Sequence, residues 1–185
     1  MPQPNLAHID GVSLSLRLAQ PQDAAYIHAL RMDPTYNRHL SAVTGTVEDQ
    51  ANWIRRYKVR EAEGSEYYYV IERRLDAQAC GLVRLYDITG NQFTWGSWIL
   101  DHNKPPKAAL ESAVLIYQIG FQRLGKNLSV FDVRGDNART LAFHARFGAV
   151  ETGKDNKDVF FHYRAEQFAA DFEGHMAALK STSLE

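Results

Sequence analysis

Two lysines stand where an apolar, strand-like segment is followed by an apolar, helix-like segment, and this junction is the part of the chain best suited to chemistry. Lys104 and Lys107 follow the run 95–100, and the helical run begins at Ala108 and Ala109. The first N–H groups of a helix point outward and the helix dipole favours negative charge, so such a junction can hold an anion. We therefore expect a cofactor cleft here.

The cysteine and histidine content argues against two other kinds of chemistry. Cys80 is the only cysteine and lies inside an apolar run, which predicts a buried thiol and a poor nucleophile. The seven histidines and this cysteine show no pair at the spacing typical of metal ligands. We expect neither a covalent thiol intermediate nor a bound metal.

Length and charge limit the classes of protein further. A chain of 185 residues with 45% hydrophobic content can bury one substantial core, which predicts a single domain over 1–185. The 21 basic and 22 acidic residues nearly cancel, which argues against nucleic acid or an anionic membrane as a partner. No signal-like or membrane-spanning segment is evident, and a lone cysteine suits a reducing compartment, so we expect a soluble cytoplasmic protein.

The hydrophobic pattern predicts the elements that would position the junction. Leu14, Leu16 and Leu18 alternate with polar residues, which is typical of a strand with one buried face. By the same reading we predict strands at 12–19, 67–73, 79–88, 92–100, 128–133 and 158–164. Helical spacing and capping residues predict helices at 21–33, 46–64, 108–124, 137–147 and 166–180.

This order of elements, together with two local segments, resembles the GNAT superfamily of acyl-CoA-dependent N-acyltransferases. The segment 96–100 (GSWIL) is similar to the family's strand before its pyrophosphate loop. The segments 137–140 (NART) and 144–149 (HARFGA) are similar to its Asn-x-x-Ser motif and aromatic-x-Lys-x-Gly-Phe ending. The resemblance covers about 12–164, leaving 165–185 as a C-terminal helix and tail, and implies an α/β (α+β) fold. Its sheet would be mixed and mostly antiparallel, flanked by helices, with the chain order β-α-α-β-β-β-α-β-α-β.

The resemblance implies transfer of an acetyl group from acetyl-CoA, used as a co-substrate, to a primary amine without a covalent enzyme intermediate. It also assigns residues to the cofactor, and these are Trp98, Ile99, Leu100, Lys104, Lys107, Ala108, Ala109 and Asn137.

Catalytic roles follow from the same resemblance. His144 stands where the family commonly has a tyrosine that protonates the leaving thiolate, and histidine can donate a proton near neutral pH. It could equally be an ordinary packed histidine. Glu111 could contact the amine through water or simply complement the helix N-terminus. His102, directly after the strand, is a second candidate base.

The acceptor is open between two classes, an amino sugar on a nucleotide carrier and a protein N-terminal amine. The first would need a cationic patch near Arg38, Arg84 or Arg134, and the second an open groove. Residues of the first loop and helices could also line the acceptor pocket, so the candidate substrate contacts are Arg38, His39, Trp53 and Arg84.

The phosphate loop departs from the family pattern, which raises an alternative function. Lys107 replaces a glycine that lets backbone approach phosphate, and Pro105 and Pro106 supply no N–H group. The alternative is a non-catalytic, GNAT-like binding or regulatory domain whose loop no longer binds CoA. Pairing of exposed strands after Gly148 into a homodimer is a further possibility.

Overall fold

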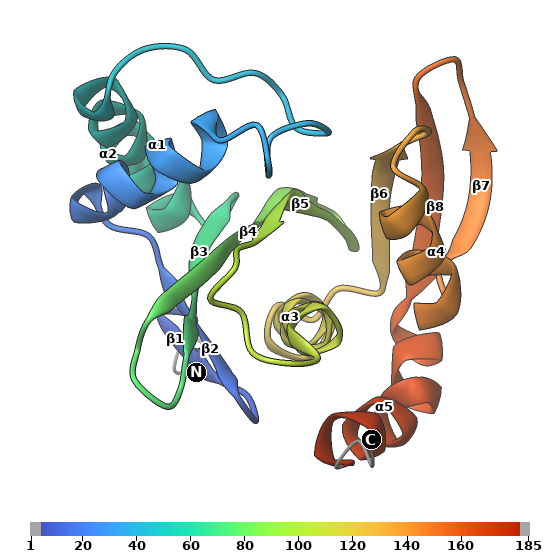
Figure 1. Ribbon diagram of the computed structural model, residues 1–185. Coiled ribbons are helices and arrows are strands. Elements are labelled where there is room, and N and C mark those ends of the chain that lie inside the picture. The colour runs from blue at the N-terminus through green and yellow to red at the C-terminus, as the bar shows by residue number, and fades with distance from the viewer. Residues whose placement is uncertain (1–4, 182–185) are drawn as a thin grey trace.

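The computed structural model describes residues 5–181, whose strands form one sheet with helices packed against both faces (Figure 1). The strands are β1 (His8–Asp10), β2 (Leu14–Leu18), β3 (Tyr67–Arg73), β4 (Ala79–Thr89), β5 (Gln92–Leu100), β6 (Leu128–Arg134), β7 (Val150–Lys154) and β8 (Asp158–Arg164). The helices are α1 (Ala24–Met32), α2 (Val47–Glu63), α3 (Ala108–Tyr117), α4 (Ala138–Phe147) and α5 (Ala165–Lys180). No helix among residues 5–181 is long and apolar enough to cross a membrane.

The sheet is continuous but nearly divided at its centre. Its order is β1-β2-β3-β4-β5-β6-β8-β7, and every neighbouring pair is antiparallel except β5 and β6. Those two parallel strands pair only at Gln92 with Leu128 and at Phe93 with Ser129. Beyond Phe93 they diverge, as the ribbon shows (Figure 1). The sheet therefore carries a wedge between two of its own strands.

A bulge in β5 lies beside this wedge. Leu82 of β4 pairs with Ile99, but Arg84 pairs with Gly96, so β5 holds one extra residue between these pairs. Ser97 takes up the irregularity with a φ of +49°, a left-handed conformation that is uncommon outside glycine. The bulge bends the strand at the point where it leaves β6.

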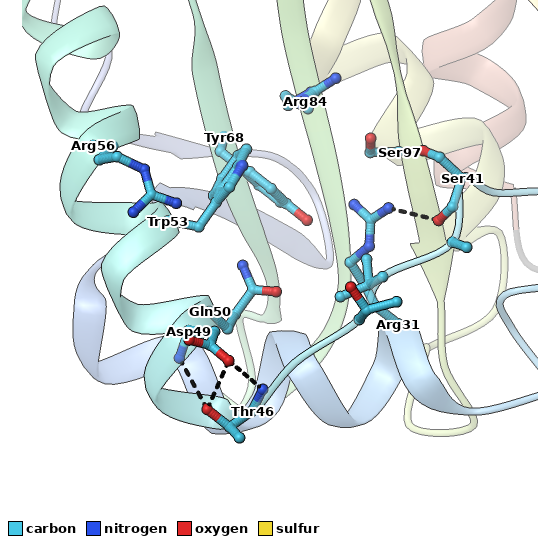
Figure 2. A pocket seen from close by; sticks show the side chains of 13 residues that line it. Arg31, Ser41, Thr46, Asp49, Gln50, Trp53, Arg56, Tyr68, Arg84 and Ser97 are labelled. Carbon is cyan, nitrogen blue, oxygen red and sulfur yellow. Dashed lines mark hydrogen bonds between the residues drawn. The ribbon is translucent and has the colours of Figure 1, made fainter.

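The smaller core lies between α1, α2 and one face of the sheet. Ile27, Ile54 and Tyr57 are fully buried against strand residues such as Val70. Trp53 of α2 meets Tyr68 of β3 edge to face, with ring centroids 5.7 Å apart (Figure 2). This cluster fixes the two helices over the β3 and β4 side of the wedge.

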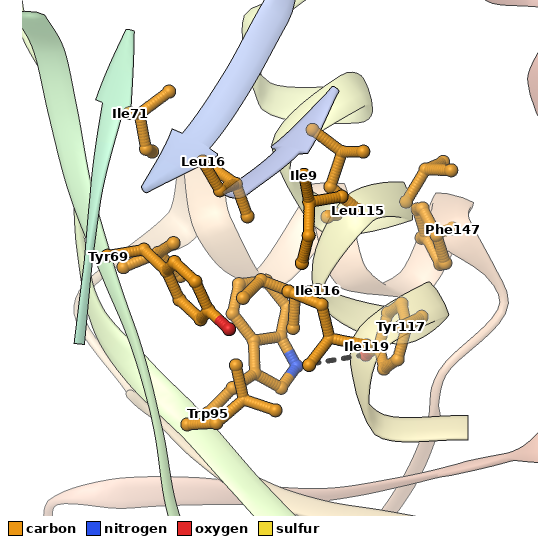
Figure 3. Packing of buried hydrophobic residues seen from close by; sticks show 14 of the residues in the cluster. Ile9, Leu16, Tyr69, Ile71, Trp95, Leu115, Ile116, Tyr117, Ile119 and Phe147 are labelled. Carbon is orange, nitrogen blue, oxygen red and sulfur yellow. Dashed lines mark hydrogen bonds between the residues drawn. The ribbon is translucent and has the colours of Figure 1, made fainter. Parts of the chain in front are cut away.

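The larger core lies on the opposite face, around α3. The Trp95 indole Nε1 donates a hydrogen bond to the Tyr117 hydroxyl over 3.1 Å, surrounded by apolar side chains (Figure 3). After Tyr117 the helix widens into a π-helical segment, Gln118–Arg123. Gly120 in that segment lets the Phe93 ring approach so closely that a Cβ there would lie 2.2 Å from it.

The predicted elements agree closely with the structure, with two omissions. β3, β5 and β8 have the predicted bounds, and the capping box of Thr46 and Asp49 opens α2 as expected. The short edge strands β1 and β7 were not among the predicted strands. β7 is exposed along its whole length and therefore lacks the alternation of buried and exposed residues that marks a strand in sequence.

Candidate active site

A cavity of about 540 Å³ opens in the wedge between β5 and β6. Its walls are β5, β6, the N-terminal part of α4 and the loop 33–46 that follows α1. His39 of this loop pairs with Asp136 of the β6–α4 turn, Nδ1 to Oδ1 over 3.1 Å, so the two sides of the wedge are tied together at this point. Of the predicted residues, the cavity brings together His39, Trp98, Ile99, Leu100, His102, Lys104, Asn137 and His144.

The β5 wall presents free backbone groups to the cavity. The Asp101 N–H donates to the Cys80 carbonyl, and Leu82 pairs with Ile99, so these residues direct their backbone polar groups toward β4. Alternate residues of a strand direct their backbone N–H and C=O groups to opposite sides within the sheet. The N–H of Leu100 therefore points away from β4, toward the cleft. β6 does not pair with β5 there. This N–H group is thus available to a ligand.

The turn after β5 is held by polar contacts of the buried Asp101 and of Tyr36. The Asp101 carboxylate accepts hydrogen bonds from the Tyr26 hydroxyl over 2.8 Å and from the Asn103 N–H over 2.7 Å. The Tyr36 hydroxyl accepts the N–H of His102 over 3.1 Å. These contacts anchor the turn to α1 and the following loop, and leave exposed Lys104 at the cavity.

The α3 N-terminus retains free donors although its loop contains two prolines. The first bonded N–H of the helix is that of Glu111, which donates to the Lys107 carbonyl over 3.0 Å. Within residues 5–181, the N–H groups of Lys107, Ala108, Ala109 and Leu110 have no hydrogen-bond acceptor. These four groups are the unsatisfied donors expected at a helix start, where an anion is stabilised.

The structure corrects the role expected for the Lys107 side chain. Its ammonium donates to the carbonyl of Ala178, over 2.7 Å, and to the carbonyl and hydroxyl of Ser181, at the C-terminus of α5. It therefore caps α5 and does not face the phosphate loop. Lys107 has a φ of +64°, the left-handed region that a glycine adopts without strain. Its backbone thus has the conformation expected of the glycine that the resemblance places here, while its side chain binds the end of α5.

Glu111 is also corrected, because it lies away from the cavity. Its buried carboxylate accepts the N–H groups of Ser13 over 3.0 Å and Leu14 over 2.7 Å. Ser13 lies in the β1–β2 turn and Leu14 begins β2, both nearly a hundred residues earlier in the chain. Glu111 thus fastens the edge of the sheet to α3 and has no free oxygen directed at an amine.

His144 sits where β5, β6 and α4 converge and is only 3% exposed. Its ring packs on Phe131, Trp95 and Phe161, with centroids 4.5, 5.5 and 5.8 Å away. Burial lowers the pKa of His144 to about 4, so the ring is neutral near neutral pH. His144 lines the cavity, and its buried Nδ1 has no hydrogen-bond partner among residues 5–181. The residue can donate one hydrogen bond but is not an imidazolium.

Two more predicted residues line a second cavity, of about 370 Å³, on the α2 side of the sheet. Trp53 and Arg84 are in its wall, together with Arg31 and Arg56 (Figure 2). Ser97 at the β5 bulge lines both cavities, so the two adjoin there. Arg38 is exposed and lines neither cavity.

Several lining residues were not singled out from the sequence. Asp132 lies on β6 in the main cavity, where burial and then the nearby Asp158 carboxylate raise its pKa. Arg139 also lines the cavity, as the second residue of α4. Its place just after the N-cap Asn137 is the sequence feature that could have identified it. Arg31 and Tyr68 come from elements far apart in the chain, and nothing in their local sequence indicates that they meet.

The single cysteine lies in the interior of the sheet and is not placed for nucleophilic attack. Cys80 is fully buried in β4, and burial raises the pKa of its thiol to about 12, as expected of a poor nucleophile. No group of three or more His, Cys, Asp or Glu side chains in this part of the chain is placed to hold a metal ion.

Comparisons with known proteins agree with this arrangement. A family model described as an acetyltransferase (GNAT) domain matches residues 13–150. The apo structure of FdhC, described as a nucleotide-linked sugar GNAT, is 37% identical, covers 91% of this chain and 96% of its own, and has a TM-score of 0.85. A ribosomal-protein-S5-alanine acetyltransferase from Vibrio fischeri shares the fold at 13% identity, covering 85% of this chain and 96% of its own, with a TM-score of 0.71. A search of curated proteins found no match.

Proposed function

The chain belongs to the GNAT acetyltransferase family, and from that premise we propose that it transfers an acetyl group from acetyl-CoA to the primary amine of a nucleotide-linked amino sugar. The observation that carries the proposal is the wedge itself. The unpaired edge of β5 leads, through residues 101–107, to a helix start with four N–H groups that have no acceptor within residues 5–181. The strand edge suits a ligand arm that carries amide groups, and the helix start suits a diphosphate.

The loop's unusual residues do not remove this capacity. Pro105 and Pro106 supply no N–H group, but the free donors of α3 begin at Lys107. Lys104 is exposed at the cavity and adds a positive charge. These observations favour the enzyme over a non-catalytic domain with a degenerate loop.

The transfer forms a bond between the amine nitrogen and the acyl carbon and breaks the bond between that carbon and sulfur. The N–H of Leu100 is positioned to polarise the thioester carbonyl. Asp132 and His102 line the cavity as acceptors for the proton that the amine loses. We place the His144 proton on Nε2, where a neutral ring donates a hydrogen bond to the departing sulfur.

The acceptor is inferred from two observations. FdhC, at 37% identity over nearly the whole chain, is described as acting on a nucleotide-linked sugar. The cationic cavity around Arg84 is the feature that such an acceptor requires. The ribosomal-protein acetyltransferase is only 13% identical, so its likeness supports the fold and not a peptide acceptor.

The proposal is tested by ligand binding and then by turnover. Acetyl-CoA at a hundredfold excess over its dissociation constant should add about 2.7 kcal/mol to the free energy of unfolding, seen as a higher melting temperature. A panel of nucleotide-linked amino sugars, free amino sugars and peptides should then release free thiol with the first class only. Absence of a thermal shift at millimolar acetyl-CoA would overturn the enzyme assignment. Thiol release with peptides alone would overturn the acceptor.

A further inference from the structure

The second cavity is built from positively charged side chains. Arg31, Arg56 and Arg84 line it, from three different elements, and Asp49 is the one carboxylate in its wall. Asp49 is already engaged, because its Oδ2 accepts the N–H and the hydroxyl of Thr46 at the start of α2. The free positive charge of the cavity therefore exceeds its negative charge.

Three polar atoms of residues that line this cavity lack a partner within the described range 5–181. The Arg31 Nε, the Tyr68 hydroxyl and the Arg84 Nε are all buried and make no hydrogen bond to that part of the chain. Tyr68 is 1% exposed, and its hydroxyl and the Arg31 guanidinium extend into the same space (Figure 2). A buried donor without a partner costs free energy, and such groups in folded proteins usually have an acceptor. Three such groups on residues that line one cavity favour an acceptor-rich ligand there.

Contacts within the protein fix the positions of Arg31 and Arg84. Arg84 packs over the Tyr86 ring, with its guanidinium carbon 4.3 Å from the ring centroid, and pairs with Glu66 over 3.0 Å. Glu66 is shared with Arg60, so it does not fully neutralise Arg84. Arg31 donates one hydrogen bond to the Ser41 carbonyl over 3.1 Å. Each guanidinium thus has a fixed position and unused donors, which suits binding of phosphate oxygens.

We propose that this cavity binds the diphosphate of the acceptor, with Arg31, Arg84 and Tyr68 as its contacts and Arg56 at its edge. This inference rests on the proposed function, since it assigns the diphosphate of the nucleotide-linked sugar to a cavity separate from the cleft. Ser97 lines both cavities, so the diphosphate lies next to the cleft in which the amine meets the thioester. The diphosphate of CoA is assigned elsewhere, to Lys104 and the start of α3.

The test uses inorganic pyrophosphate, titrated by calorimetry into the full chain saturated with CoA so that the α3 site is occupied. Arg84→Gln and Arg31→Gln should each weaken pyrophosphate binding about tenfold, the value of one charge-assisted hydrogen bond. Arg56→Gln should weaken it by a smaller factor, and it removes an exposed side chain that has no hydrogen bond or ion pair within residues 5–181. Arg55→Gln is the matched control, because Arg55 is the adjacent residue of α2 but bonds Glu48 and Asn52 away from the cavity.

The outcomes separate this inference from the proposed function. Weaker pyrophosphate binding in the three cavity variants, with unchanged CoA affinity and an unchanged Arg55→Gln control, supports the inference even where no acceptor is yet known. Equal pyrophosphate affinity in all variants overturns it, even where acetyl transfer is confirmed. A parallel loss of CoA affinity would assign the cavity to the cofactor instead and would also overturn it. Melting temperatures of each variant identify any loss due to unfolding.

Discussion

At the scale of single residues, the most informative side chain is His144. The resemblance places it where the family commonly has a tyrosine, and it is buried among aromatic rings with no partner for Nδ1 in the described part of the chain. The pKa of about 4 that results from this burial makes it a neutral donor and excludes an imidazolium as the acid near neutral pH. The role of His144 as the group that assists the leaving thiolate stays a prediction, and its neutral state means that it would act by donating a hydrogen bond.

His144 should make folding stability depend on pH. Above pH 6.5 the ring is neutral in both the folded and unfolded chains, so it has no effect. As pH falls, the unfolded chain takes up the proton first, while the folded chain stays neutral until about pH 4. The free energy of unfolding should therefore fall by up to about 3 kcal/mol across that window. Urea unfolding of the native chain and of His144→Gln, compared as a difference curve, measures this loss.

The same variants test catalysis by His144. His144→Phe should lower kcat more than it raises KM, because a hydrogen bond to the departing sulfur acts in the transition state. His144→Gln retains an N–H donor and should recover part of kcat. An unchanged kcat in His144→Phe would remove this residue from the mechanism, and parallel pH curves for the native chain and His144→Gln would contradict its assigned pKa.

At the scale of elements, the start of α3 has two roles, whereas sequence analysis assigned both of its lysines to one anion site. Its N–H groups are free for an anion, while the Lys107 ammonium binds the carbonyl end of α5. The two lysines that looked equivalent therefore differ, because Lys104 is exposed at the cavity and Lys107 caps α5. A cation at a helix C-terminus is stabilising, since the dipole is negative there.

Variants of Lys104 and Lys107 should differ in which property they change, CoA affinity or folding stability. Lys104→Ala should weaken CoA binding at low salt and much less at high salt, as expected of an exposed charge contact. Lys107→Met should leave CoA affinity unchanged but lower the free energy of unfolding by about 1 kcal/mol, because the α5 cap is lost while the left-handed backbone stays non-glycine. Calorimetry at two salt concentrations and thermal unfolding measure both. A fall in CoA affinity in Lys107→Met would restore the original expectation.

Prediction from sequence succeeded where the signal is local. Asn137 as an N-cap and Gly148 as a helix stop are both found, the latter with a φ of +116°, because caps depend on a few neighbouring residues. The strands that alternate or are wholly apolar were found for the same reason. Glu111 could not be interpreted correctly, because its partners Ser13 and Leu14 are close only in the folded chain.

At the scale of the whole molecule, the two parts of the sheet meet at a narrow joint. β5 and β6 pair at only two positions, and one of these contains Phe93. The Phe93 ring packs on Gly120 and is flanked by Tyr117 and Phe121, with centroids 6.4 and 5.4 Å away. The π-helical segment after α3 thus packs against the last paired position of β5 and β6, where the wedge begins.

Adding one methyl group at this joint should disturb the whole fold. In Gly120→Ala the new Cβ would lie 2.2 Å from the Phe93 ring, and such overpacking costs about 1–3 kcal/mol. Gly174→Ala is the matched control, because Gly174 is also helical and a Cβ there meets nothing within 4 Å. Denaturant unfolding should show a loss for the first and no loss for the second. Equal stability of the two variants would mean that Phe93 can move without consequence.

The wedge also bears on self-association. Unpaired strand edges are templates for the addition of a foreign strand, and aggregation commonly begins at them. Here the two edges lie inside the sheet and separate progressively from Phe93, so no second polypeptide can pair with both along their length. The loop carrying His39 crosses to Asp136 at one point of the opening. The unpaired β5 edge is thus open to a narrow ligand that enters the wedge, whereas one further strand cannot bridge β5 and β6 there.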